Sequence, residues 1–487
     1  MPPSVAKNTF SLTLGFIGQK VLSLIYFSLL ARSLGPEEVG KYTFALAFTT
    51  IFSILADIGI TPVFIREVAR DERASRRILA VLLPIKLLLT LLASSAAIGS
   101  ALILHYPPHV VLLILLSSGV MALDALHLSF YGFLRGKKIL SYESIGVIAG
   151  QALTVTLGIL GIFWHLPLPF FMVALGVGSI FNVLWSGITA WRLGMRFFFL
   201  WEPKLVRTLL AAAIPFALAG IFTKVYSYID TVLLASLKDN FTVGIYSVPY
   251  KITYAFQFLP MALSAALFPA LSSAYKKDTR EFRLLFERGL SYMAILVLPI
   301  VAGIFTLAPE ILVHIFGSAF EPSLEPLRVS IFGLLFIFLY FPAGAALNAA
   351  ERQGTNTFFM GIAMIVNIFL NIFLIPSLGA TGASIAAVAT NAILFCLVFI
   401  TVVKMVGWPK GITPLIVKTT LAAVIMSAAV FGAKDFLPSP LLSIPCGALI
   451  FILLTFFFGI VKKNDIELAR RVFRREKPAE APPANQS

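Results

Sequence analysis

The sequence predicts an all-α polytopic membrane protein of about 14 transmembrane helices. Of its 487 residues, 59% are apolar and only 13% are charged, which is about half the charged share of a soluble domain. A spanning helix needs roughly 20 mostly apolar residues, so this composition would furnish about fourteen of them. The composition excludes a soluble enzyme and a disordered chain, and two cysteines in apolar runs exclude a disulfide scaffold.

Runs of spanning length follow one another along the chain, separated by short polar breaks. The first run, 10–32, is longer than the roughly 7–15-residue core of a signal peptide and lacks a convincing small-residue cleavage site, so we predict a retained helix. The predicted segments are 10–32, 42–62, 78–104, 110–134, 144–164, 168–191, 208–236, 244–268, 288–308, 326–348, 356–376, 380–403, 415–434 and 441–461.

The positions of lysine and arginine predict the orientation, because cytoplasmic loops collect these residues. With the N-terminus inside, the inner loops and the tail hold 29 of the 38 basic residues, and the outer loops hold four. We therefore expect a multi-pass protein of the cytoplasmic (inner) cell membrane with both termini in the cytoplasm. The scatter of the +15 net charge over many loops argues against nucleic acid as a partner.

An internal repeat relates two halves of the chain. Shifting the sequence by 204 residues without gaps aligns Leu14–Tyr42 with Leu218–Tyr246, with 12 identities in 29 positions. The informative identities are a mid-helix lysine and a Gly-x-Tyr turn, at Lys20/Lys224, Gly40/Gly244 and Tyr42/Tyr246. Six helices per repeat is an even number, so both repeats have the same orientation, as in transporters with parallel repeats.

The repeat divides the chain into four predicted parts. These are an N-terminal six-helix lobe at 1–207, a C-terminal six-helix lobe at 208–404, two additional transmembrane helices at 405–461 and a basic cytoplasmic tail at 462–487. The substrate of such transporters lies between the halves, and access alternates as one lobe rocks against the other. In the tail, apolar residues alternate with arginines, which suits a short helix on anionic membrane lipids or a solvated positive tail.

Charged side chains inside the predicted helices are the candidate functional residues, because a charge at mid-bilayer is costly unless it faces a cavity or a partner. Lys20 lies about ten residues (roughly 15 Å) from either end of its helix, too deep for easy snorkelling. Lys224 is its repeat equivalent. We expect both lysines to line the cleft between the lobes, next to Gln19 and Thr223, or to pair with a local carboxylate.

Two further charges follow Lys224 in the sequence. Asp230 lies six residues along the same helix, where its repeat partner is Tyr26. It could hold a coupling proton or sodium ion, or pair with Lys224 or Lys251. Lys251 lies some seven residues from the outer end of its helix, so it either lines the cavity or snorkels to the surface. Lys86, near the inner end of helix three, is expected to snorkel.

Asp57 and Asp124 are the other acidic candidates for ion coupling. Asp57 precedes Gly59 and Pro62, so it could equally cap or break its helix. Asp124 has His127 one turn later, which suits a proton relay or a structural hydrogen bond. A structural role is favoured for both aspartates.

Enzyme signatures are missing from the sequence, so we expect no catalytic residue, cofactor or metal. The five histidines form no HExxH-type ligand spacing, and no Gly-rich loop precedes a Lys-Ser/Thr pair. Short outer loops leave no room for an extracellular active site, which argues against a glycosyltransferase or a polysaccharide polymerase.

Two blocks of sequence resemble the polysaccharide flippases of the multidrug/oligosaccharidyl-lipid/polysaccharide (MOP) exporter superfamily. The first comprises Asn8–Gly59, with the turn Leu30–Tyr42, and then Ile65–Arg70. The second comprises Leu347–Arg352, followed by Asn367, Asn371 and Ile375–Ala383. The fourteen helices, the six-plus-six repeat and the two extra helices agree with this family along the whole chain.

The resemblance implies translocation of a polyprenyl-diphosphate-linked oligosaccharide from the cytoplasmic to the outer leaflet, for cell-surface polysaccharide biosynthesis. A diphosphate needs cationic partners in a low-dielectric cleft. Lys20, Lys224 and Lys251, with Arg66 at the inner mouth, would supply them. Proteins of polysaccharide synthesis and export would be its partners. Related lipid II flippases use more cavity arginine, which favours capsule, O-antigen or exopolysaccharide units as cargo.

Three alternatives remain open at this point. A cation-coupled drug or metabolite exporter would need cavity carboxylates for a cationic cargo, whereas Asp230 is the one mid-helix acid in the first pair of matched helices. A lipid II flippase would differ only in its cargo. A non-transporting scramblase or a membrane assembly subunit belongs to a different functional class.

Overall fold

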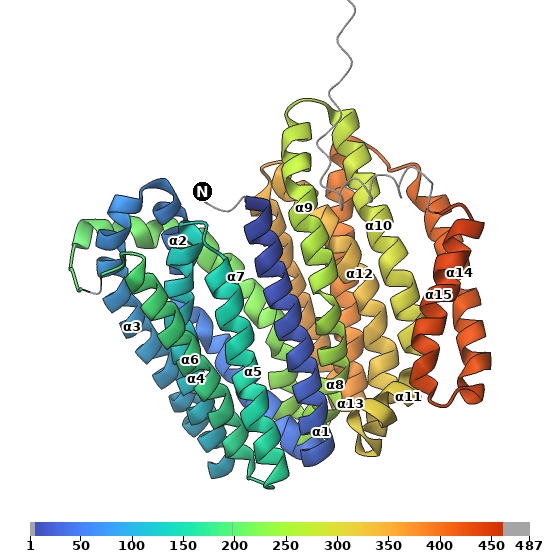
Figure 1. Ribbon diagram of the computed structural model, residues 1–487, viewed down its shortest axis with the longest axis horizontal. Coiled ribbons are helices and arrows are strands. Elements are labelled where there is room, and N and C mark those ends of the chain that lie inside the picture. The colour runs from blue at the N-terminus through green and yellow to red at the C-terminus, as the bar shows by residue number, and fades with distance from the viewer. Residues whose placement is uncertain (1–4, 197, 461–487) are drawn as a thin grey trace, which may run out of the picture.

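In the computed structural model, which describes residues 5–196 and 198–460, the described chain is helical and contains no strand (Figure 1). The side chains of 5–14 and 72–75 lie outside this description. The helices are α1 (Val5–Asp57), α2 (Ile60–Arg70), α3 (Glu72–Ile103), α4 (Pro108–Gly136), α5 (Ser141–Phe163), α6 (Leu168–Arg192), α7 (Pro203–Leu237), α8 (Asn240–Phe256), α9 (Phe258–Tyr275), α10 (Thr279–Thr306), α11 (Ala308–Ile311), α12 (Leu324–Ala349), α13 (Gln353–Val406), α14 (Ile412–Ala433) and α15 (Ser443–Phe457).

Within the described residues, twelve helical segments are long and apolar enough to cross a membrane. Two of them, α1 with 53 residues and α13 with 54, contain a glycine with non-helical dihedral angles, at Gly35 and Gly379. A straight helix of that length would measure about 80 Å, far more than a bilayer. Each therefore crosses twice, and the fold agrees with the predicted count of about fourteen.

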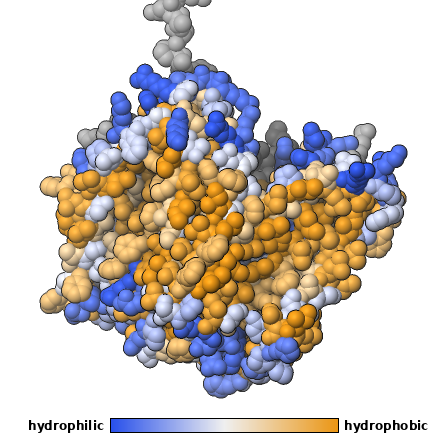
Figure 2. Space-filling view, turned by 180° about the vertical axis from the view of Figure 1, so that it is seen from behind, coloured by the Kyte–Doolittle hydropathy of each residue, from blue (hydrophilic) through white to orange (hydrophobic). Residues whose placement is uncertain are grey.

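The surface of the molecule carries the apolar band that a bilayer requires. Figure 2 shows a broad hydrophobic belt around the middle of the visible face, with hydrophilic residues gathered at its two ends. Large apolar side chains of the long helices lie exposed, as at Phe373 and Leu91, which are 72% and 64% exposed. In water such a surface would promote association, whereas in lipid it is the expected exterior.

The helices form two bundles that lean together at one end (Figure 1). One bundle contains α2–α6, the other contains α8–α13, and α1 and α7 run between them. The last two helices, α14 and α15, pack on the outside of α10. The predicted boundaries at 207, 404 and 461 stay predictions, and the tail at 462–487 lies outside the described residues.

The hydrophobic core explains why the bundles meet at one end. We call the end opposite the N-terminus, where α1 bends at Gly35, the distal end. There a single core joins both bundles, with Leu30 and Val39 packed in the same cluster as Val243 and Phe316. At the opposite end, which we call the proximal end, each bundle has a separate hydrophobic core. The shared core closes the distal end and leaves the lobes separate at the other.

Glycines make the closest contact of the distal closure. A Cβ atom on Gly40 would lie 1.7 Å from the carbonyl oxygen of Asn240, and one on Gly244 would lie 1.9 Å from the carbonyl oxygen of Pro36. These four residues are repeat partners, because 204 residues separate Pro36 from Asn240 and Gly40 from Gly244. The two lobes therefore meet through the same backbone surface, in a self-complementary arrangement like that of a two-fold dimer.

Hydrogen bonds reinforce this contact beside the glycines. A π-helical turn, Leu312–Phe316, follows α11 and lies against α1. Ser28 Oγ donates to the carbonyl oxygen of Ile315 at 2.6 Å, and the Arg32 guanidinium donates to the carbonyl oxygen of His314. Both bonds join the N-terminal lobe to the C-terminal lobe, so opening of the distal end would break them.

We expect Gly40→Ala and Gly244→Ala to open the distal end. Adding a methyl group to a packed contact costs about 1–3 kcal/mol, so the population of the closed state should fall by roughly tenfold or more. The measurement is double electron–electron resonance between nitroxides on His109→Cys and Glu321→Cys, with Cys396 and Cys446 replaced by serine. The glycine variants should give a longer distance between the nitroxides than the protein with both glycines intact.

The matched control is Gly220→Ala, because a Cβ atom at Gly220 meets nothing within 4 Å. This variant should keep the wild-type distance distribution. If the gate variants give that same distribution, the glycine contact does not hold the distal end closed.

Candidate functional site

Two cavities of similar size lie between the helices, one in each lobe. The C-lobe cavity has a volume of about 420 Å³ and is lined by α7, α8, α12 and α13. The N-lobe cavity has a volume of about 440 Å³ and is lined by α1, α4, α5 and α6, with residues of α7 and α8. Three side chains line both cavities, at Tyr228, Tyr250 and Tyr254. We call these three residues the tyrosine wall.

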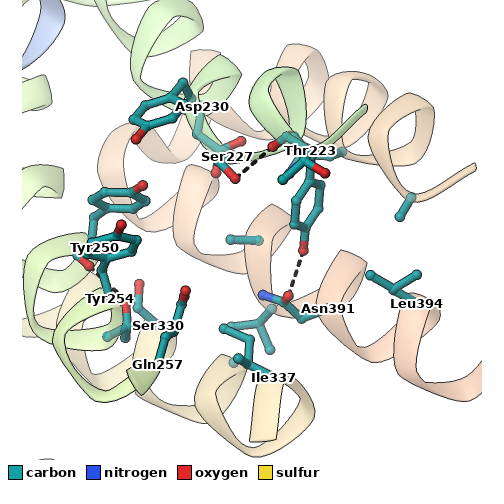
Figure 3. A pocket seen from close by; sticks show the side chains of 18 of the residues that line it. Thr223, Ser227, Asp230, Tyr250, Tyr254, Gln257, Ser330, Ile337, Asn391 and Leu394 are labelled. Carbon is teal, nitrogen blue, oxygen red and sulfur yellow. Dashed lines mark hydrogen bonds between the residues drawn. The ribbon is translucent and has the colours of Figure 1, made fainter. Parts of the chain in front are cut away.

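Two members of the tyrosine wall, Tyr250 and Tyr254, lie on one face of α8. Tyr246, Tyr250 and Tyr254 recur every four residues, so they lie above one another along the helix. The rings of Tyr250 and Tyr254 are parallel within 11°, with centroids 5.9 Å apart, and Figure 3 shows them side by side at the cavity. Tyr228 reaches the same place from α7, and its ring centroid lies 6.4 Å from that of Tyr250.

Two of the predicted cavity lysines lie near this wall and near each other. Lys20 Nζ lies 3.8 Å from the centroid of the Tyr254 ring and 3.4 Å from the Tyr254 carbonyl oxygen. Lys251 lines the N-lobe cavity, with Nζ 5.3 Å from the Phe27 ring. Both ammonium groups therefore rest on aromatic faces, an arrangement that partly offsets their removal from water. Lys251 and Tyr254 lie three residues apart on α8, so the two lysines adjoin the same stretch of that helix.

The third lysine, Lys224, lies on the other side of the wall. It lines the C-lobe cavity together with Tyr250 and Tyr254. It lies on α7, one of the two helices that run between the bundles. Lys20 and Lys224, predicted to face one cleft, thus both lie at the boundary between the lobes.

The two remaining substrate-binding candidates differ in position. Gln19 lines the N-lobe cavity, next to the wall. Arg66 instead lies exposed on α2, where its guanidinium bonds to Glu67 at 2.9 Å, and it lines neither cavity. The structure therefore brings Gln19 together with the lysines and leaves Arg66 apart from them.

Asp230 lies buried at the edge of the C-lobe cavity. It pairs with neither of the lysines suggested by the sequence. Its carboxylate accepts hydrogen bonds from the Tyr246 hydroxyl at 2.9 Å and from the Asn371 amide at 2.7 Å. Neutral donors leave the negative charge of the carboxylate uncompensated, which is costly in a buried site.

Further oxygen atoms surround Asp230 without a donor. The side-chain oxygens of Asn367 and Asn371 are buried and accept no hydrogen bond from the described part of the chain. Carboxylate and amide oxygens gathered in this way are hard ligands, of the kind that alkali and alkaline-earth cations prefer. The cluster of Asp230, Asn367 and Asn371 thus has the chemistry of a small-cation site.

The repeat shows that this cluster belongs to one lobe alone. The positions equivalent to Asp230 and Tyr246 are Tyr26 and Tyr42, two buried members of one hydrophobic cluster. At this position the N-terminal lobe has a phenol ring in place of a carboxylate. Gly158 accommodates the ring, because a Cβ atom there would lie 2.1 Å from the Tyr26 ring.

Asp124 lies in the lining of the N-lobe cavity and keeps the predicted contact with His127. The His127 Nε2 atom is 3.1 Å from the carboxylate, and Ser179 Oγ donates to the same oxygen at 2.6 Å. The Asp124 side chain is 46% exposed, and it faces the cavity. It is therefore hydrated and available to ions, unlike Asp230.

Asp57 is paired with Lys86 inside the N-terminal lobe. The expectation that Lys86 snorkels to the surface is therefore wrong. Lys86 is 3% exposed and donates to Asp57 and to Thr61 Oγ1, each at 2.7 Å. Asp57 also accepts from the backbone N–H and the hydroxyl of Thr61, which begins the next helix. The chain breaks at Gly59, with φ of 71°, as one of the sequence alternatives stated.

Two carboxylates outside the spanning segments mark the proximal rim. Lys276 lies 2.9 Å from Glu351 and lowers the pKa of that carboxyl group. Arg77 likewise holds the pKa of Glu202 below its usual value through a pair of hydrogen bonds. Both pairs are exposed, so they keep the rim charged and hydrated.

The sequence analysis missed the tyrosine wall and the amide partners of Asp230. The four-residue spacing of Tyr246, Tyr250 and Tyr254 was the available signal, since it predicts one aromatic helix face. Asn367 and Asn371 stood out as family motif residues, but nothing in their local sequence connects them with a helix some 140 residues away. Within the described residues no group of three or more potential metal-ligating His, Cys, Asp or Glu side chains occurs.

Comparison with known proteins places these features in a family. The family model described as polysaccharide biosynthesis protein matches residues 5–275, and the MatE model matches residues 215–373. The chain is 22% identical to the probable low-salt glycan biosynthesis flippase Agl15 of Haloferax volcanii, over 96% of this chain and 97% of that protein. It is 23% identical to the putative O-antigen transporter of Shigella flexneri, over 79% and 94% of the two chains.

The fold has a counterpart among solved structures. The lipid II flippase MurJ in an inward closed conformation superposes with a TM-score of 0.76 at 15% identity, covering 92% of this chain and 98% of that one. These named relatives are flippases and transporters. Because the first family model spans more than half of the sequence and the fourteen-helix fold agrees, the chain belongs to the polysaccharide biosynthesis protein family, within the MOP superfamily of membrane transporters.

Proposed function

We propose that the protein is a flippase that moves a polyprenyl-diphosphate-linked oligosaccharide from the cytoplasmic to the outer leaflet by alternating access. The observation that carries this proposal is the set of three lysines, Lys20, Lys224 and Lys251, around the tyrosine wall between the lobes. A diphosphate binds tightly where several ammonium groups form charge-assisted hydrogen bonds with it in a partly desolvated site. The glycan-flippase and O-antigen-transporter names of the full-length relatives support the same cargo class.

The direction of transport rests on the orientation proposed from the charge distribution. With the N-terminus in the cytoplasm, the distal end faces outward, and the lobes separate toward the cytoplasm. A lipid-linked substrate would enter from the inner leaflet, keep its chain in the bilayer and carry its polar head between the lobes. Opening of the glycine contact would then release the head on the outer side. Contacts of the tail with anionic lipids and with synthesis proteins stay predictions.

A cation-coupled exporter of the MATE type is the second candidate, favoured by the MatE match over residues 215–373. Such a protein would bind a cationic drug. Lys224 and Lys251, which line the cavities, and Lys20, which contacts the tyrosine wall from outside both linings, would repel that cargo. Asp124 is the one cavity carboxylate with substantial exposure among the described lining residues. The balance of charge therefore supports an anionic head group.

We expect Lys20→Ala, Lys224→Ala and Lys251→Ala each to impair polysaccharide export in a strain lacking its own flippase. A hydrogen bond to a charged group contributes about 1.5–3 kcal/mol, so each loss should weaken diphosphate binding roughly tenfold to hundredfold. Export is measured as surface polysaccharide, and binding is measured on purified protein with farnesyl diphosphate.

Lys204→Ala is the control, because Lys204 is exposed at the start of α7 and lines neither cavity. Normal export by the Lys20→Ala/Lys224→Ala double variant would disprove the phosphate clamp. Resistance to cationic drugs on expression, without restored export, would favour the exporter.

The coupling ion is proposed to bind at Asp230, within the oxygen cluster completed by Asn367 and Asn371. A sodium ion or a proton there would neutralise the buried carboxylate and link the C-terminal lobe to the ion gradient. Asp124, hydrated and bonded to His127, is a weaker candidate for proton transfer. Asp57 is left out of the proposal, because Lys86 already compensates its charge.

We expect NaCl, compared with choline chloride at the same ionic strength, to raise the melting temperature of the purified protein. A ligand at 100-fold its Kd stabilises the folded state by about 2.7 kcal/mol. Asp230→Asn, which keeps the shape of the side chain, should abolish the difference, and Asp124→Asn should keep it. An undiminished sodium effect in Asp230→Asn would exclude this site; no sodium effect in the wild type would leave the proton as the coupling ion.

A further inference from the structure

The C-lobe cavity has the lining of a sugar-binding site. Besides Lys224 and Asp230, its polar lining includes hydroxyl and amide groups, at Thr223, Ser227, Gln257, Ser330 and Asn391, several of which Figure 3 shows pointing toward the same space. Neutral groups that both donate and accept hydrogen bonds suit the hydroxyls of a sugar. Aromatic faces suit its C–H surfaces, because the negative face of the ring attracts partly positive hydrogens.

Not every tyrosine at this cavity is free to take a ligand. The hydroxyl of Tyr226 donates a hydrogen bond to Asn391 at 2.6 Å, that of Tyr246 donates to Asp230, and that of Tyr340 donates to Asn356. These three hydroxyl groups are therefore already used in bonds within the protein. In contrast, Tyr254 is 39% exposed and lines both cavities. Its ring is the most accessible part of the wall, and it stands where the two cavities meet.

One contact connects this ring with the phosphate-binding group. Lys20 Nζ lies 3.8 Å from the centroid of the Tyr254 ring. The sugar next to the lipid is bonded directly to the diphosphate through its anomeric oxygen. A diphosphate held by Lys20 therefore brings that sugar within a few bond lengths of Tyr254.

We infer that Tyr254 is the stacking platform for the sugar that is bonded to the diphosphate. The inference rests on the proposed function and names the subsite of its first sugar. Before the substrate binds, Lys20 covers the ring. A diphosphate offers this ammonium a charge-assisted bond that is stronger than its contact with the ring. Lys20 moves to the phosphate, and the uncovered face receives the pyranose ring.

The test compares two probes on the purified full-length protein. One probe is farnesyl diphosphate, and the other is the same compound with one α-linked glucose on its terminal phosphate. The wild type should bind the glucosylated probe more tightly. Tyr254→Leu should lower the affinity for the glucosylated probe about tenfold and leave the affinity for farnesyl diphosphate unchanged or higher. Tyr254→Phe, which keeps the ring face, should behave as the wild type does.

Two further variants serve as controls for this comparison. Lys20→Gln should weaken binding of both probes while keeping the preference for the glucosylated one, which separates the sugar subsite from the phosphate clamp. Loss of that preference in Tyr254→Phe, which keeps the ring face, would contradict the platform even where Tyr254→Leu fails to fold. Tyr275→Leu, exposed at the end of α9 and outside both cavities, should change neither affinity.

Each other outcome overturns the inference in a distinct way. Equal losses for both probes in Tyr254→Leu would make Tyr254 a structural residue. A wild type that binds both probes equally would exclude the sugar subsite and leave the phosphate clamp intact. A wild type that binds neither probe would overturn the proposed function together with this inference.

Discussion

The backbone contact between Gly40 and Asn240, with its repeat copy between Gly244 and Pro36, is the constraint on which the rest of the structure depends. It brings two six-helix bundles together at one end, where a single hydrophobic core spans both. The bundles separate toward the other end, because there each has its own core. Each lobe keeps a cavity of its own, and the tyrosine wall, which lines both cavities, stands where the two lobes adjoin.

The two lobes share a plan and differ in chemistry at one place. The N-terminal lobe has two buried tyrosines, Tyr26 and Tyr42, where the C-terminal lobe has Asp230 hydrogen-bonded to Tyr246. Replacing a phenol by a carboxylate changes a packing position into a charged one, and the amides of the C-terminal lobe then surround it with oxygen. A duplicated scaffold thus retains its symmetric closure while only one copy carries the chemistry of a small-cation site.

Much of the architecture could be predicted from the sequence, because a bilayer dictates helix length and charge placement. The fourteen segments, the repeat and the break after Asp57 follow from such local rules. The rotation of a helix about its own axis does not, since neighbouring helices determine it. Lys86 shows this: its depth was evident, but its burial against Asp57 depends on how α3 packs. The partner of Asp230 lies 141 residues away, beyond any local pattern.

The contacts of Lys20 and Lys251 with aromatic rings have a consequence for the proposed transport cycle, in the half during which no cargo is bound. A carrier must return to the cytoplasmic side empty, and bare ammonium groups would then attract inorganic anions such as chloride or phosphate. Lys20 on Tyr254 and Lys251 near Phe27 are partly satisfied by the protein itself. A small ion gains little by displacing such a contact, whereas a diphosphate with attached sugar gains at several points. In the proposed transport cycle, the resting contacts would therefore favour an empty return without a futile leak of anions.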